Sequence, residues 1–237
     1  MMRSLVLAGA LVSALAAPVG ADGRAGAPAP APGLTVGDVA RTQCTAAELR
    51  PLADQLLAEA ACLRPGALVA IDDVPGLALG FNASPLLGAA AARALRAAAD
   101  GARLTVYSTT RALVQQYVYH QWATRRRCPM VVAVADRPGQ SRHESGLAID
   151  TPDFAAWKDR LAAAGFRWRG RRDAVHFDYR GPGATDLRRA SVRAFQRLWN
   201  RNHPHDRIGE HGRYDAATAR RVARAPAAGF PLGPSCR

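Results

Sequence analysis

The four cysteines of this chain, Cys44, Cys62, Cys128 and Cys236, restrict its fold more than any other sequence feature. They form no Cys-x-x-Cys pair, which argues against a structural metal knot or a redox motif. In an oxidising compartment they would form two disulfides, and three pairings are possible. We expect Cys44 to pair with Cys62 and Cys128 with Cys236, because the second bond would tie the C-terminal tail to the main domain.

The first 21 residues have the composition of a secretory signal peptide. Arg3 supplies the positive start, Leu5–Ala17 the apolar stretch, and Val19–Ala21 a cleavage site of small residues. A membrane anchor is the alternative, but the apolar stretch is short and is broken by Pro18, so it would span a bilayer poorly. We therefore expect an exported protein, periplasmic or extracellular, with no stable membrane insertion after cleavage.

The chain of 237 residues carries a formal net charge of +13. Such a charge is typical of proteins that bind nucleic acid or an anionic surface. Export argues against nucleic acid, so the cell wall is the better anionic partner. Lys158 is the single lysine among 32 basic residues, and a compositional bias toward arginine explains the charge equally well.

The pattern of apolar residues predicts an α+β protein with short strands and segregated helices. Residues 22–36 are rich in Ala, Pro and Gly and should form a flexible leader. Residues 37–184 should form the main domain, with a small antiparallel or mixed sheet and flanking helices, and the Gly-Pro-Gly run at 181–183 separates it from a helical segment over 185–237. We expect helices over 45–62, 85–99, 111–122 and 154–164, and strands over 68–71, 77–81, 104–107, 130–135, 146–149 and 175–179, with the first two strands paired.

Two short segments contain the residues with the clearest chemistry, Ser141–Asp150 and Asp173–Tyr179. His143 and Asp150 lie on one loop and strand, because Gly146 permits a tight turn between them, and His176 lies on a second strand. Two imidazoles and one carboxylate are the ligands of a catalytic zinc ion, which keeps its fourth position for water. An isolated histidine beside apolar strand residues is more often structural, so the prediction depends on the joint pattern.

Asp173 precedes His176 by three residues at a junction between loop and strand. This position would bring its carboxylate near the attacking water without making it a metal ligand. We therefore predict that Asp173 is the general base.

The string Ser-x-His-x-x-Gly-x-Ala-x-Asp, with an acidic residue three before a later histidine, resembles the zinc D-Ala-D-Ala peptidases of the VanY type. The resemblance implies the fold shared with hedgehog signalling domains, one zinc ion held by His143, Asp150 and His176, and D-alanyl-D-alanine carboxypeptidase activity on peptidoglycan peptides. The base in that family is commonly Glu, whereas this chain has Asp173. An endopeptidase that cuts inside the wall peptide, such as between L-Ala and D-Glu, is therefore the alternative activity.

The run Ser108–Arg111 followed by Gln115 resembles the segment of the same family in which an arginine lies near the substrate. The resemblance implies that Arg111 stabilises the substrate carbonyl or the developing oxyanion, and that Gln115 and Ser141 help to bind substrate. An arginine on a solvated face at a helix start is the alternative for Arg111, and ordering of the loop is the alternative for Ser141.

The segment Ser191–Trp199 resembles the first helix of a peptidoglycan-binding module, and Gly212, Tyr214 and Thr218 fit its later part. The resemblance implies that the enzyme is anchored to the wall, and we expect it to be a monomer. A helical cap with a structural role is the alternative for this segment. A wall-binding protein without catalytic activity is the alternative for the whole chain.

Overall fold

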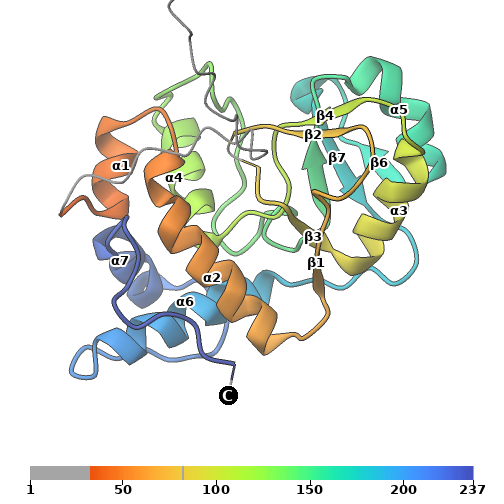
Figure 1. Cartoon of the computed structure of the whole chain (residues 1–237). Helices are drawn as coiled ribbons and strands as arrows, with labels where there is room; N and C mark the ends of the chain where they lie inside the picture. Colours follow the sequence, from red (N-terminus) through yellow and green to blue (C-terminus); the bar gives the residue numbers. More distant parts are fainter. Residues whose placement is uncertain (1–32, 82, 237) are drawn as a thin grey trace, which may run out of the picture.

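The computed structural model describes residues 33–81 and 83–236 and has the predicted α+β architecture (Figure 1). The predicted signal peptide and residues 22–32 of the predicted leader lie outside the described residues. No helix in the described part is long and apolar enough to cross a membrane.

Helices and short strands alternate along the described chain. The helices are α1 (Val36–Thr42), α2 (Arg50–Leu63), α3 (Ala89–Ala99), α4 (Leu113–Thr124), α5 (Phe154–Ala163), α6 (Arg188–Asn202) and α7 (Ala216–Arg224), and 3-10 turns span Ala47–Leu49 and Arg171–Asp173. The strands are β1 (Leu68–Ala70), β2 (Leu77–Leu79), β3 (Leu86–Gly88), β4 (Leu104–Val106), β5 (Ala148–Asp150), β6 (Phe166–Trp168) and β7 (His176–Tyr179).

Within the described residues the strands form three small sheets. β1 pairs antiparallel with β3, β2 pairs parallel with β4, and β7 lies between β5 and β6 in an antiparallel sheet. The predicted pairing of β1 with β2 is therefore wrong. Gly76, with φ +79°, lies so close to the backbone of Ala102 that a Cβ would be 2.5 Å from its carbonyl oxygen. This close approach directs β2 along β4 instead of back along β1.

Several predicted elements differ from the structure. Residues 130–135 form an irregular segment instead of a strand, because the chain turns at Cys128, whose carbonyl accepts hydrogen bonds from the amides of Val131 and Val132. The predicted helix over 85–99 contains β3 and then α3. Helix α1 and strand β6 are absent from the prediction, and Thr35 caps α1 inside the segment expected to be a flexible leader.

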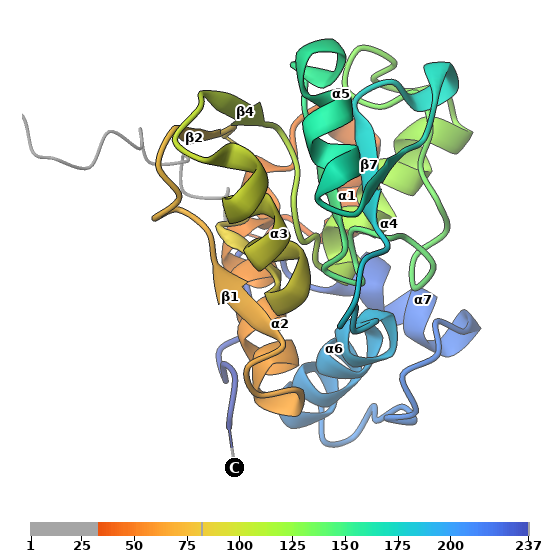
Figure 2. The same ribbon diagram turned by 90° about the vertical axis from the view of Figure 1, so that its right-hand side faces the viewer.

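Buried apolar side chains form two cores on either side of the molecule. One core lies among α1, α2, α4, α6 and α7 and includes the fully buried Trp122, Phe195 and Trp199. The other lies between the sheets and helices α3 and α5 and includes Phe177 and Leu161. Helices α6 and α7 pack with α1 and α2 (Figures 1 and 2), so the C-terminal residues share a core with the N-terminal helices.

The disulfides join Cys44 to Cys128 and Cys62 to Cys236, so the predicted pairing is wrong. Cys44 precedes α2 and Cys62 lies in its last turn, so nearly the whole helix separates them, and its 14 residues span about 21 Å at 1.5 Å per residue. That separation is far beyond the reach of a disulfide. Packing of α1 on α4 brings Cys44 to Cys128 instead, while the C-terminal tail follows α2 to Cys62.

We predict that replacing Cys44 and Cys128 together by serine lowers the free energy of unfolding by about 2 to 5 kcal/mol, because the unfolded chain loses a cross-link. Urea unfolding of the oxidised wild type and the double variant measures the difference. Peptide mapping without reduction should recover the Cys44–Cys128 and Cys62–Cys236 peptides. A linked Cys44–Cys62 peptide would contradict this arrangement.

Candidate active site and metal centre

The loop that contains His143 is stabilised by hydrogen bonds between its own side chains and its own backbone amides. Ser141 Oγ accepts a hydrogen bond from the amide of His143 at 3.2 Å, and the carboxylate of Glu144 accepts from the amides of Gly139 and Ser141. Glu144 is buried, and burial raises the pKa of its carboxyl to about 8. Ser141 thus contacts the backbone of this loop, and its two predicted roles, binding substrate or ordering the loop, stay predictions.

Gly146 makes the tight turn that the sequence indicated. Its φ is +72°, a conformation that favours glycine. The amide of Gly88 donates to the Gly146 carbonyl at 2.8 Å, and a Cβ on Gly88 would lie 2.7 Å from that oxygen. This contact between two glycines places β5 against the start of α3 and fixes the path from His143 to Asp150.

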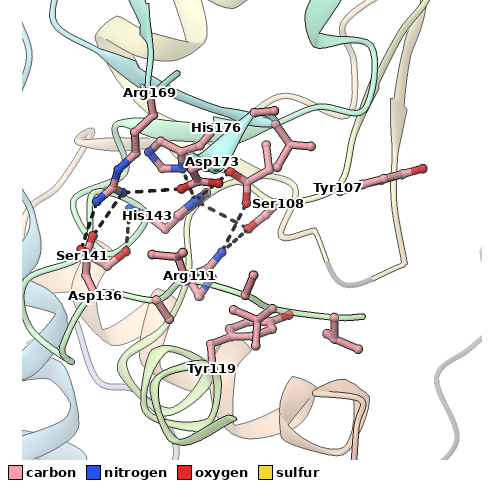
Figure 3. Close-up of a pocket in the computed structure, with 18 of the residues that line it drawn as sticks. Tyr107, Ser108, Arg111, Tyr119, Asp136, Ser141, His143, Arg169, Asp173 and His176 are labelled. Atoms are coloured by element: carbon pink, nitrogen blue, oxygen red, sulfur yellow. Dashed lines mark hydrogen bonds and ion pairs between the residues drawn. The ribbon is translucent and has the colours of Figure 1, made fainter. Parts of the chain in front are cut away.

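The antiparallel pairing of β5 with β7 places Asp150 directly opposite His176. Asp150 Oδ1 lies 2.9 Å from His176 Nδ1 and 3.2 Å from His143 Nε2, and these two ring nitrogens are 3.1 Å apart. The structure thus brings together the predicted metal ligands, and one possible ligand atom from each lies within 4.8 Å of the other two. Figure 3 shows His143 and His176 side by side in this cavity.

The other nitrogen of each imidazole is held by an acceptor. His143 Nδ1 lies 2.8 Å from the carbonyl oxygen of Thr109, and His176 Nε2 lies 2.9 Å from Asp178 Oδ1. A carbonyl accepts and cannot donate, so Nδ1 of His143 carries the proton and Nε2 is left for a metal. Metal-bound histidines usually make such an outer hydrogen bond.

Asp178 was not predicted as a site residue. A signal for it was available, since residues two apart on a strand point to the same face. The spacing His-x-Asp therefore places the Asp178 carboxylate beside the His176 ring.

Arg111 lies inside the site and not on a solvated face, since its side chain is 12% exposed. Its guanidinium donates to Ser108 Oγ at 2.9 Å, approaches Asp150 Oδ2 at 3.5 Å and lies 4.5 Å above the Tyr119 ring. Burial alone would raise the pKa of Asp150, but His143, His176 and Arg111 hold it well below its usual range. Asp150 is therefore a carboxylate, the form that binds a cation.

Gln115 does not line this cavity. Its amide oxygen accepts a hydrogen bond from the backbone amide of Ala112 at 2.9 Å and so closes the first turn of α4. Its neighbour Gln116 instead accepts from Arg111 Nη1 at 2.8 Å and donates to the carbonyl of Asp136. Gln116 is a further residue of the site that the sequence did not indicate.

Asp173 lies at the wall of the same cavity as the three candidate ligands (Figure 3). Burial raises the pKa of its carboxyl, and the neighbouring His176 opposes this rise. Arg169 approaches Asp173 at 3.8 Å and forms a closer ion pair with Asp136 at 3.2 Å. The guanidinium thus connects the segment of Asp173 to the irregular segment that follows Cys128.

The cavity has a volume of about 650 Å³, large enough for a short peptide. Ser141 and Arg111 lie at its inner surface, and residues 129–135 form one wall. Exposed apolar side chains at its edge are Phe81, Tyr107, Met130, Val131 and Val134. Trp168 and Tyr179 do not line this cavity and pack with the core beside α5.

Residues 87–174 match the family model described as VanY, D-alanyl-D-alanine carboxypeptidase. This segment is similar to VanY-type domains. The predicted class of enzyme, a zinc D-alanyl-D-alanine carboxypeptidase, is thereby confirmed. No curated protein and no solved structure matches the chain significantly.

The VanY match covers less than half of the chain and includes Arg111, His143, Asp150 and Asp173. It ends two residues before His176. The tertiary structure therefore supplies the third candidate ligand, because β7 places His176 beside the two ligands of the matched segment. The resemblance of residues 191–199 to a peptidoglycan-binding helix lies outside the match and stays a prediction.

We predict that His176→Ala reduces bound zinc from about one ion per chain to near zero, because two of the usual three protein ligands do not hold the ion. Elemental analysis after gel filtration measures the zinc content. His205→Ala is the matched control, since His205 is exposed in the turn after α6. Unchanged zinc content in His176→Ala would contradict the ligand assignment.

Proposed function

We propose that this protein is an exported zinc peptidase that removes the terminal D-alanine from peptidoglycan stem peptides. The observation that supports the proposal most strongly is the convergence of His143, Asp150 and His176 in a cavity of the VanY-type domain. The disulfides agree with an oxidising compartment outside the cytoplasm.

The residues present fit a zinc ion. The donors are two imidazole nitrogens and one carboxylate oxygen, a common catalytic zinc set. Thr109 and Asp178 occupy the outer nitrogens of the imidazoles. When bound there by His143, Asp150 and His176, zinc would polarise the scissile carbonyl and lower the pKa of water.

Asp173 is the proposed general base. Its partly buried carboxylate shares the cavity with the ligands, and its raised pKa suits a group that takes and returns protons. The carboxylate removes a proton from the attacking water and later delivers it to the leaving amine of the released D-alanine. Arg169, at 3.8 Å, limits the positions that this carboxylate adopts.

Arg111 is the proposed stabiliser of negative charge on the carbonyl oxygen of the substrate. Ser108, Gln116 and the Tyr119 ring fix its guanidinium before substrate arrives. A donor fixed in advance needs no reorganisation as charge develops.

Ser141 and Gln115 have different proposed roles: Ser141 contacts the substrate, whereas Gln115 supports the helix beside Arg111. The Ser141 hydroxyl lines the cavity and accepts from His143, so its own proton is available for a substrate oxygen. Gln115 does not touch the substrate in this proposal. Its side-chain oxygen accepts a hydrogen bond from the amide of Ala112 and so holds the first turn of α4, which follows Arg111 in the chain.

A peptidoglycan endopeptidase is the second candidate activity. The observation that favours it is Asp173, since this carboxylate is one methylene shorter than the family's common Glu and therefore reaches less far into the cavity. The complete ligand set and the adjacent acid argue against the third candidate, a wall-binding protein without catalysis.

We also propose that residues 185–237 bind the cell wall as part of a monomer. Arg193 and Arg220 are exposed on α6 and α7 and would favour an anionic polymer. Other arginines of this region are used internally, such as Arg197, which pairs with the buried Glu59 of α2 at 2.9 Å.

We predict that Asp173→Ala retains zinc but loses hydrolysis by roughly 10² to 10⁴-fold, because the proton of the attacking water has no acceptor. The kcat on a D-Ala-D-Ala peptide and the zinc content are measured on the same sample. Asp159→Ala, on the opposite side of α5 from the core, is the matched control. Hydrolysis at the wild-type rate in Asp173→Ala would exclude the assigned role.

The bond that is cleaved is tested by mass spectrometry of muropeptides after digestion. The proposal predicts loss of a single terminal alanine from pentapeptide stems. New ends inside the stem would favour the endopeptidase. Wall binding without any cleavage by the zinc-loaded protein would refute both peptidase activities.

A further inference from the structure

Asp178 lies one strand residue beyond Phe177 on β7, on the same face as His176. Its Oδ1 is 2.9 Å from His176 Nε2, and its side chain is 10% exposed. His143 Nε2 and Asp150 Oδ1 both lie near His176 Nδ1. The Asp178 carboxylate therefore contacts the opposite nitrogen of the ring, Nε2.

Two arginines hold the Asp178 carboxylate in place. Arg180 Nη2 lies 3.1 Å from Oδ2, and Arg142 Nε lies 3.7 Å from Oδ1. Arg142 is itself fixed, because it donates to the carbonyl of Tyr179 at 2.9 Å. In addition, the backbone of Asp178 is paired with Ala148 of β5. The position of the Asp178 carboxylate beside His176 is thus fixed by the pairing of β7 with β5 and by the two arginines.

We propose that Asp178 is a positioning residue that selects the ring nitrogen of His176 available to a metal. The carboxylate accepts the Nε2 proton, so Nδ1, which is turned toward His143 and Asp150, is the ring nitrogen available to a metal. The inference goes beyond the ligand set and rests on the proposed function for the identity of the ion.

The two histidines of the site differ in how they are oriented. His143 is held by the backbone carbonyl of Thr109, which no side-chain substitution removes. His176 is held by a side chain that carries a charge. A hydrogen bond to a charged acceptor is about twice as strong as a neutral one, and outer partners of this kind typically change metal affinity by 10- to 100-fold.

The test compares the full-length mature protein with its Asp178→Asn variant, which keeps the size of the side chain but removes its charge. We expect the dissociation constant for zinc, measured by competition with a chromogenic chelator, to rise about 10- to 100-fold. The absorption spectrum of the cobalt-loaded variant should also shift, because the ring of His176 changes orientation. Asp186→Asn is the matched control, since Asp186 pairs with Arg188 away from the ligands.

Urea unfolding in the presence of a chelator shows whether Asp178→Asn folds like the wild type. A second measurement needs no variant. In the zinc-loaded wild type, long-range proton–nitrogen correlation spectra should show the His176 proton on Nε2. This tautomer is the direct consequence of the Asp178 contact. It therefore tests the role of Asp178 even if the Asp178→Asn variant does not fold.

Zinc affinity within two-fold of the wild type in a folded Asp178→Asn variant, with an unchanged cobalt spectrum, would overturn the role of Asp178. A His176 proton on Nδ1 in the zinc-loaded wild type would overturn it as well. These results would leave the proposed peptidase function intact. A wild-type protein that binds no zinc would overturn both proposals.

Discussion

The pairing of β5 with β7 is the interaction on which the rest of the site depends. It sets Asp150 opposite His176 in register and carries the preceding loop, with His143, to the same point. A shift of one residue in this register would turn His176 to the other face of the sheet and remove it from the site. The backbone bonds of this short ladder therefore hold the candidate metal ligands together.

Charge is concentrated around this ladder. Asp150 faces Arg111 and the two histidines, Asp178 faces His176 and two further arginines, and both carboxyls have a lowered pKa, that of Asp178 at about 2. Each buried carboxylate thus has cationic or hydrogen-bonding partners, as burial of charge requires. Asp173 differs, because its pKa is raised by burial. The same small region contains carboxylates suited to binding a cation and one suited to proton transfer.

The cavity is lined by residues of α4, β5 and β7. The helical core fixes α4 and, through Gln116, the guanidinium of Arg111, while the core beside the sheets fixes β5 and β7. The bond between Cys44 and Cys128 joins α1 to the start of the irregular segment that forms one cavity wall. The segment after Gly183 adds α6 and α7 to the helical core, which also holds α4. This segment therefore supports the site even if it does not bind the cell wall.

The sequence by itself indicated the candidate metal ligands and most of the helices and strands that contain them. His143, Asp150 and His176 were recognisable because ligand type, order and the glycine between them are local properties of the chain. The α+β class followed from periodicity. Only the tertiary structure decided the strand partners of β1 and β2, the irregular segment at 130–135, the disulfide pairing and the places of Gln115 and Gln116. These depend on contacts between residues far apart in the chain, such as the approach of Gly76 to Ala102 and the packing of α1 on α4. Local propensity contains no information about such contacts, because they form only when the two cores close.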